Sequence, residues 1–162
     1  MNLSVSGLSW PKRKKARQLA VAAARLGVRN EAAIHYTQGP RRWDGIDRGL
    51  RAYKGQFPSY ADCSSFTTWC LWQGLGHYHC PDYVNGANWS AGYTGTQKTH
   101  GKPVKYRVNW RSGDLVHYGA GTGRHVAIYI GRGQVISHGS EGGPMVLPWN
   151  YRSDYAETRR YI

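Results

Sequence analysis

Cys63 is the residue whose type and position most clearly suggest chemistry. It stands in the run Asp62-Cys63-Ser64-Ser65, at the start of a helix that we predict over residues 63–75. The positive end of a helix lowers the pKa of a thiol and favours the nucleophilic thiolate, so we expect this helix to activate Cys63. Asp62 is of a residue type that commonly begins helices. The alternative is a buried structural cysteine, which is common in protein cores.

A nucleophilic cysteine needs a base, and His125 is placed to supply one. It opens a predicted strand over residues 125–130, in which Val126, Ile128 and Ile130 share one face. Because side chains alternate along a strand, we expect His125 to point to the other face. A histidine in a surface loop is the alternative interpretation.

The base must in turn be oriented by a third polar group, and the sequence leaves this choice open. His138 ends the next predicted strand, over residues 134–138. A two-residue turn between the strands would place His138 on the face of His125, whereas a symmetric three-residue turn over 131–133 would place Ser137 there. A shift of one residue therefore decides between His138 and Ser137.

The elements that must position these residues follow an α+β order. The helices come first: one over residues 11–26 that stops at Gly27, and the one that begins at Cys63. Between them we expect a loop with one short helix near residues 46–53. Glycine-rich turns then separate five short β-type runs: 104–108, 114–118, 125–130, 134–138 and 145–147. This order predicts a single domain over residues 1–162, with N-terminal helices packed on a C-terminal antiparallel sheet.

The chain is strongly basic, which indicates a polyanionic partner. Its 162 residues include 22 Lys and Arg against nine Asp and Glu, for a formal net charge of +13. Twelve of the basic and three of the acidic side chains fall in residues 1–60. Nucleic acid, an anionic membrane surface and an acidic cell wall all fit such a charge. The 40% of hydrophobic residues exclude a fully disordered protein, and no apolar run is long enough to span a membrane.

The three cysteines, Cys63, Cys70 and Cys80, cannot all be paired within the chain. Cys70 follows Cys63 by two helical turns, about 10 Å of rise, which is too far for a disulfide. The start of the chain does not read as a secretory signal, so we predict synthesis in a reducing cytoplasm. His77 and His79 beside Cys80 could bind a soft metal. Without a paired CxxC motif a solvated loop is the better interpretation, and we predict neither a metal nor another cofactor.

Taken together, these motifs resemble the NlpC-type cysteine peptidases of bacterial cell walls, which have a papain-like fold. The matching segments are Asp62-Cys63-Ser64-Ser65-Phe66, Ser112-Gly113-Asp114-Leu115-Val116, His125-Val126-Ala127-Ile128-Tyr129-Ile130-Gly131 and Val135-Ile136-Ser137-His138. The likeness covers residues 16–142 and includes the helix-first order. Residues 34–43 and 137–144 further resemble peptidase modules of endolysins from phages of actinobacteria.

The resemblance implies catalytic roles for three residues. Cys63 would be the nucleophile and His125 the general base. As the third residue we favour His138. Its rivals are Ser137, which stands where the family normally has this residue, and Glu141.

The resemblance also points to residues that contact the substrate. Tyr36 lies where the family often has a tyrosine beside the oxyanion, and its hydroxyl could act there with the backbone N–H of Cys63. An ordinary packed aromatic is the alternative for Tyr36. Asp62 either fixes the helix start or binds a substrate amine, and its neighbour Ser64 is a further candidate for substrate binding.

The implied function is that of an endolysin-like peptidoglycan hydrolase, which would cut the stem peptide between D-glutamate and the diamino acid. A CHAP-type N-acetylmuramoyl-L-alanine amidase is the first alternative. A non-catalytic basic protein that binds nucleic acid or the cell envelope is the second. We expect a monomer that binds peptidoglycan and anionic wall polymers, but not nucleic acid. It would reach the wall as a phage lysis protein or as a delivered effector.

Overall fold

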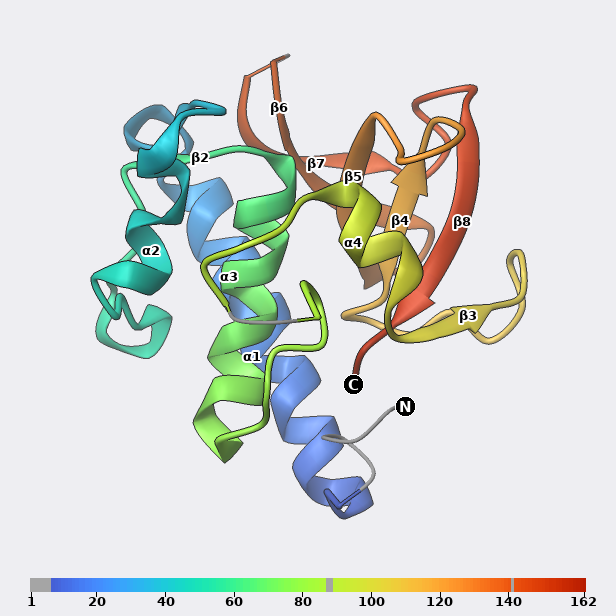
Figure 1. Cartoon of the computed structure of the whole chain (residues 1–162), viewed down its shortest axis with the longest axis horizontal. Coiled ribbons are helices and arrows are strands. Elements are labelled where there is room, and N and C mark those ends of the chain that lie inside the picture. The colour runs from blue at the N-terminus through green and yellow to red at the C-terminus, as the bar shows by residue number, and fades with distance from the viewer. Residues whose placement is uncertain (1–6, 87–88, 141) are drawn as a thin grey trace.

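Two helices form one layer of the molecule and a six-stranded sheet forms the other (Figure 1). The helices are α1 (Trp10–Arg29) and α3 (Cys63–Leu75), which lie side by side and both contact the sheet. The computed structural model describes residues 7–86, 89–140 and 142–162. The predicted α+β order, with helices packed on an antiparallel sheet, is confirmed.

Two glycines bring α1 and α3 close together. A Cβ atom on Gly27 would lie 2.7 Å from the ring of Phe66, and one on Gly74 would collide with the carbonyl of Ala16. The helices therefore run antiparallel. The prediction that Gly27 stops the first helix is wrong, because this glycine serves the contact with α3 while the helix continues. Asn30 ends α1 instead, since its side-chain amide donates to the Leu26 carbonyl at 2.9 Å.

Short elements make up the connection between α1 and α3. In chain order they are η1 (Glu31–Ala33), β1 (His35–Tyr36), η2 (Pro40–Trp43), α2 (Asp44–Asp47), η3 (Ala52–Lys54) and β2 (Tyr60–Ala61). The short helix predicted near 46–53 is thus split into α2 and η3. β1 and β2 pair in parallel, with Tyr36 opposite Ala61. This pairing ties residues 35–36 to the strand that leads directly into α3.

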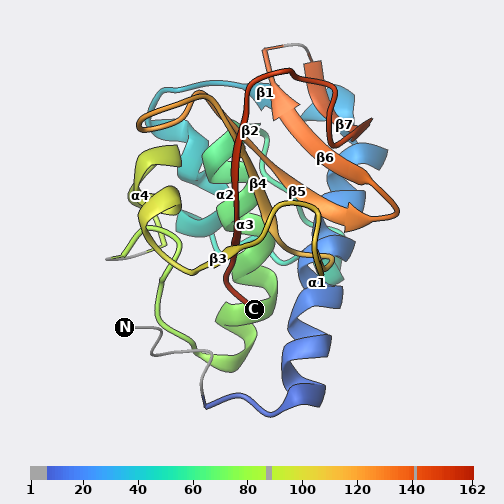
Figure 2. The same cartoon turned by 90° about the vertical axis from the view of Figure 1, so that its right-hand side faces the viewer.

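The sheet is antiparallel throughout and has the order β3-β8-β4-β5-β6-β7. Its strands are β3 (Lys102–Val104), β4 (Leu115–Tyr118), β5 (His125–Gly131), β6 (Gln134–Gly139), β7 (Gly142–Pro148) and β8 (Tyr155–Arg160). Figure 2 looks onto this sheet, with α3 behind it. The runs predicted at 114–118, 125–130, 134–138 and 145–147 are confirmed as strands. The run 104–108 is wrong beyond Val104, where turns follow.

Three elements after α3 escaped prediction: η4 (Gly76–Tyr78), α4 (Thr94–Thr99) and β8. β8 carries Glu157, Arg159 and Arg160 and has no apolar alternation. It nevertheless lies inside the sheet, because it pairs with β3 on one side and β4 on the other.

The two faces of the sheet are both apolar but have different neighbours. Val126, Ile128 and Ile136 belong to the main core under the helices. Ala127 and Val135 lie on the opposite face, in a smaller cluster covered by aromatic rings from Trp110, Tyr129, Trp149, Tyr151 and Tyr155. Among the described residues, no helix combines the length and the apolar character that crossing a bilayer requires.

Candidate active site

The nucleophile candidate, Cys63, is the first residue of α3, and its position is set by a cap. Oδ1 of Asp62 accepts from the backbone N–H of Ser65 at 2.8 Å, and the Ser65 hydroxyl accepts from the backbone N–H of Asp62 at 2.9 Å. This reciprocal capping box satisfies two N–H groups that a helix start leaves unpaired. The prediction that Asp62 fixes the helix start is therefore confirmed.

The thiol of Cys63 is less acidic than the helix position alone suggested. Burial raises its pKa to about 12, and the neighbouring Asp62 carboxylate acts in the same direction. The backbone N–H groups of Val126, Ser64 and Cys63 itself favour the thiolate but do not outweigh burial. The expectation of a lowered pKa is thus wrong, because Cys63 is only 7% exposed. Its ionisation requires a base.

His125 begins β5, the strand whose start lies against Cys63. The backbone N–H of the following residue, Val126, is among the groups that contact the Cys63 sulfur, so Cys63 meets the sheet at the start of β5. Nε2 of His125 lies 2.7 Å from Oγ of Ser137, within hydrogen-bond distance. Oγ of Ser137 lies 3.0 Å from the hydroxyl of Tyr151. A buried imidazole is thereby joined to two hydroxyl groups in series.

His138 does not face His125. Its Nε2 lies 3.0 Å from the carbonyl oxygen of Ala61, and its ring packs against Tyr36 and Phe66 at centroid distances of 5.6 and 5.7 Å. A carbonyl can only accept, so Nε2 carries the proton. His138 thus holds the strand that precedes Cys63, from the helix side of the sheet.

A β-bulge explains why His138 lies on that side. Gly131 pairs with Gln134, which leaves Arg132 and Gly133 as a two-residue turn. Both turn residues have positive φ angles, 54° and 72°, as tight hairpins require. The register then shifts between Tyr129 and Gly131, so the face expected from the turn alone is reversed. The expectation that such a turn places His138 beside His125 is therefore wrong, and Ser137 is there instead.

Tyr36 and Ser64 lie near Cys63 in different surroundings. Tyr36 is 37% exposed, and its hydroxyl accepts from Nε2 of Gln38 at 3.2 Å. Ser64 is buried, and its hydroxyl donates to Oδ1 of Asp62 at 3.0 Å. Ser64 therefore belongs to the cap in this structure. Glu141, the remaining rival for the third position, lies outside the described residues.

Gln97 and Tyr151 belong to the site, and no sequence motif pointed to either residue. Gln97, from α4, is fully buried, and its Nε2 donates to the carbonyl of Ser64 at 3.1 Å and to Oγ1 of Thr68 at 3.1 Å. These hydrogen bonds stabilise the first turn of α3. Tyr151 follows β7 in a turn, where neither periodicity nor motif marks it. Only the folded sheet reveals its contact with Ser137.

The described residues hold no cluster of three or more His, Cys, Asp or Glu side chains arranged for a metal ion. The polar groups around Cys63 are instead those of acyl transfer: a thiol, an imidazole and backbone N–H donors.

Comparison with known proteins places this site in a family. A family model described as the NlpC/P60 family matches residues 51–159. Murein DD-endopeptidase MepS/murein LD-carboxypeptidase of Escherichia coli K12 is 41% identical over 70 residues, which are 41% of this chain and 37% of that protein. The chain thus matches less than half the length of this relative.

Solved structures show the same fold. The peptidoglycan hydrolase RipB from Mycobacterium tuberculosis matches with a TM-score of 0.66 and 20% identity, over 98% of this chain and 70% of that chain. An NlpC/P60 family protein from Bacillus cereus matches with a TM-score of 0.50 and 28% identity, over 64% of this chain and 32% of that chain. These matches confirm the predicted NlpC-type fold. Since the family model covers more than half of the sequence and includes both Cys63 and His125, the chain belongs to the NlpC/P60 family.

Proposed function

We propose that this protein is a peptidoglycan hydrolase, a cysteine peptidase that cuts amide bonds of the stem peptide. The observation that carries the proposal is the placement of Cys63 at the capped start of α3, against the start of β5, where His125 is held by Ser137. Family membership and the names of MepS and RipB support the substrate class. The family match also favours a peptidase over a CHAP-type amidase.

In the proposed reaction, His125 removes the Cys63 proton as Sγ attacks the amide carbonyl carbon. We assign the proton of the neutral ring to Nε2, which lies 2.7 Å from Oγ of Ser137, so that the lone pair is on Nδ1, the atom that would take the Cys63 proton. The raised pKa of Cys63 makes this transfer necessary, because the free thiol stays protonated at neutral pH. The C–N bond then breaks, and His125 returns the proton to the leaving amine.

Water completes the cycle by hydrolysing the thioester, again with His125 as the base. Charge that develops on the carbonyl oxygen needs hydrogen-bond donors. The Cys63 backbone N–H and the Tyr36 hydroxyl are the groups we propose for this role. Tyr36 is held near Cys63 because β1 pairs with β2, with Tyr36 opposite Ala61.

Ser137 is the third member of the proposed catalytic set, in place of His138. It is fully buried and has its Oγ between Nε2 of His125 and the Tyr151 hydroxyl. A serine cannot neutralise an imidazolium as a carboxylate does, but it can fix the ring and its tautomer. Tyr151 would keep the serine hydroxyl in that orientation.

Two bonds of the stem peptide are candidates for cleavage. The resemblance to NlpC-type peptidases favours the bond between D-glutamate and the diamino acid. The name of MepS, a DD-endopeptidase, favours the cross-link between two stem peptides. Action as a phage lysis enzyme or delivered effector is part of the proposal, and it rests on the likeness of residues 34–43 to endolysin modules.

The proposal is tested on purified bacterial cell walls. The release of soluble fragments is measured as the decrease in turbidity of the wall suspension. The wild-type protein should clear the walls, whereas Cys63→Ala should bind them equally well in a sedimentation assay without clearing them. A basic binding protein without catalysis would give the same result for both proteins, and that outcome would refute the proposal.

A further inference from the structure

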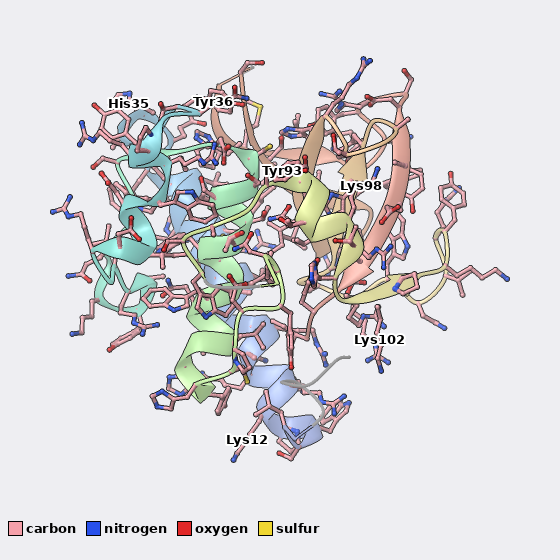
Figure 3. All side chains as sticks on the ribbon, viewed as in Figure 1. Lys12, His35, Tyr36, Tyr93, Lys98 and Lys102 are labelled. Atoms are coloured by element: carbon pink, nitrogen blue, oxygen red, sulfur yellow. The ribbon has the colours of Figure 1, made fainter. Side chains whose placement is uncertain are left out.

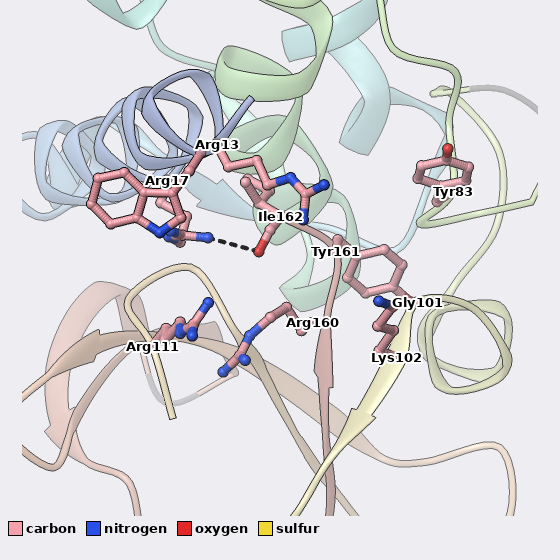
Figure 4. Close-up of a pocket in the computed structure, with 10 residues that line it drawn as sticks. Arg13, Arg17, Tyr83, Gly101, Lys102, Arg111, Arg160, Tyr161 and Ile162 are labelled. Carbon is pink, nitrogen blue, oxygen red and sulfur yellow. Dashed lines mark hydrogen bonds between the residues drawn. The ribbon is translucent and has the colours of Figure 1, made fainter. Parts of the chain in front are cut away.

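A cavity lined by cationic side chains opens between α1, β8 and the segment before β4. Its volume is about 290 Å³, and Figure 4 shows Arg17, Arg111 and Arg160 around Ile162. The lining residues are Trp10, Arg13, Arg17, Tyr83, Gly101, Lys102, Arg111, Arg160, Tyr161 and Ile162. Five of them carry positive charge and none carries a negative side chain.

Asp114 is the acidic group that holds this arrangement together. Its carboxylate accepts from Arg160 at 2.8 Å through Oδ1 and at 2.7 Å through Oδ2. Oδ2 also accepts from the backbone N–H of Arg111 at 2.8 Å, which fixes the segment that carries the Arg111 side chain. One carboxylate thus orders two of the cationic residues but neutralises only one guanidinium.

The remaining cations crowd one another. Arg17 donates to the main-chain oxygen of Ile162 at 3.0 Å, and burial together with the charges of Arg111, Arg160 and Arg13 lowers its pKa. The side chains of Arg111 and Lys102 are exposed and make no hydrogen bond or ion pair within the described part of the chain. The cationic side chains repel one another at these distances, and an anion bound among them would reduce this repulsion.

This cavity is separate from the candidate active site. Ala16, one residue before Arg17, packs against Gly74 near the end of α3. Cys63 begins the same helix 11 residues earlier, so the two sites are separated by about 16 Å along the helix axis. Figure 3 labels Lys102, which lines the cavity, at the lower right of the molecule, and Tyr36 at its upper end.

We propose that the cavity binds phosphate groups of an anionic wall polymer, a chain of polyol or sugar phosphodiesters. Guanidinium groups pair with phosphate oxygens in a bidentate geometry, and several of them around one small cavity suit a phosphodiester that is accessible from solvent. Trp10, which is 63% exposed, borders the cavity and offers aromatic surface to the neighbouring polyol or sugar unit. The site would hold the protein on the wall without touching the bond that is cut.

The test measures binding of a soluble glycerol phosphate oligomer by calorimetry at about 0.15 M salt, where exposed charges are partly screened. The double variant Arg111→Gln/Lys102→Gln removes the two exposed cations of the cavity. The matched control is Arg48→Gln/Lys54→Gln, which removes the same charge from exposed positions outside it. We expect the cavity variant to weaken binding about tenfold, as loss of charge-assisted hydrogen bonds implies. The control should change affinity less than twofold.

Two further probes identify the ligand. Polyglutamate of similar length should bind more weakly and respond equally to both double variants. Equal losses of oligomer affinity in both variants would mean diffuse charge attraction and would overturn the proposal. Inorganic phosphate that binds as tightly as the oligomer would make free phosphate the ligand and would also overturn it. Cys63→Ala should bind the oligomer like the wild type, so this test stands apart from any failure of the proposed hydrolase activity.

Discussion

Nε2 of His125 lies 2.7 Å from Oγ of Ser137, although the hairpin that joins their strands has a two-residue turn. In a regular hairpin that turn would bring the next residue, His138, to this face. The bulge between Tyr129 and Gly131 reverses the alternation and brings Ser137 there. The third member of the proposed catalytic set therefore depends on a single extra residue in β5.

Replacing Ser137 with alanine should slow catalysis with little effect on substrate binding. The change removes the partner of Nε2 and frees the imidazole to rotate. We expect kcat to fall about tenfold or more, ~1.4 kcal/mol of transition-state stabilisation, with a much smaller change in KM. Kinetics on a soluble stem peptide measure both constants. Ser153→Ala, at an exposed position, is the matched control, and equal kinetics of the two variants would argue against a role for Ser137.

Tyr151→Phe should have a smaller effect that depends on Ser137. It deletes the hydroxyl and keeps the ring, which packs against Tyr118 and His125. Loss of one hydrogen bond implies a change of about 0.5–1.5 kcal/mol in the activation free energy. In the Ser137→Ala background the same change should have almost no effect, because the two groups act in series. Additive effects in this double-mutant cycle would contradict the series arrangement.

His138→Gln should affect stability more than chemistry. Glutamine keeps an N–H donor but loses the ring that packs between Tyr36 and Phe66. We expect the free energy of unfolding to fall by about 1–2 kcal/mol in denaturant titrations. Under conditions in which the variant is folded, kcat should stay within about threefold of the wild type, because the loss of a packing contact leaves proton transfer intact. A folded His138→Gln protein without activity would restore His138 as the catalytic third residue.

Cys63 should make the folded protein less stable at alkaline pH. Its pKa rises from the ordinary value of 9.0 to about 12 on folding, so the native state keeps a proton that the unfolded chain releases. The stabilising contribution is complete below pH 9 and is lost as the pH rises from 9 toward 12, by about 1.4 kcal/mol per pH unit. Denaturant unfolding at pH 8, 9 and 10 should therefore show a steeper decline for the wild type than for Cys63→Ser. Parallel declines would exclude the raised pKa.

The sequence predicted the elements whose patterns are local. The helix from Cys63 to Leu75 has the expected bounds, because Asp62 and Ser65 form a capping box. The strand at His125 follows its alternation of apolar residues. β8 was missed because its sequence is polar. It is a strand because β3 and β4 pair with it on both sides, and local β-propensity does not include such tertiary pairing.

The candidate site was predictable only in part. Cys63 and His125 stand out by residue type and position. The third residue depends on a bulge and Tyr151 on a turn that returns to the sheet, and both are set by packing rather than by sequence pattern. Gly27 shows the same limit, since a glycine near a helix end usually signals a stop but here provides room for Phe66.

Mass spectrometry of peptidoglycan fragments after digestion shows whether this protein cuts the stem peptide. Purified walls would be treated with the wild-type protein or with Cys63→Ala and then analysed for new peptide ends. We expect that only the wild-type protein produces cut stem peptides. New diamino acid amino termini would mark cleavage next to D-glutamate, and separated dimers would mark cleavage of the cross-link. Intact stem peptides and cross-links after complete incubation with folded wild-type protein, or identical fragments from both proteins, would contradict this expectation.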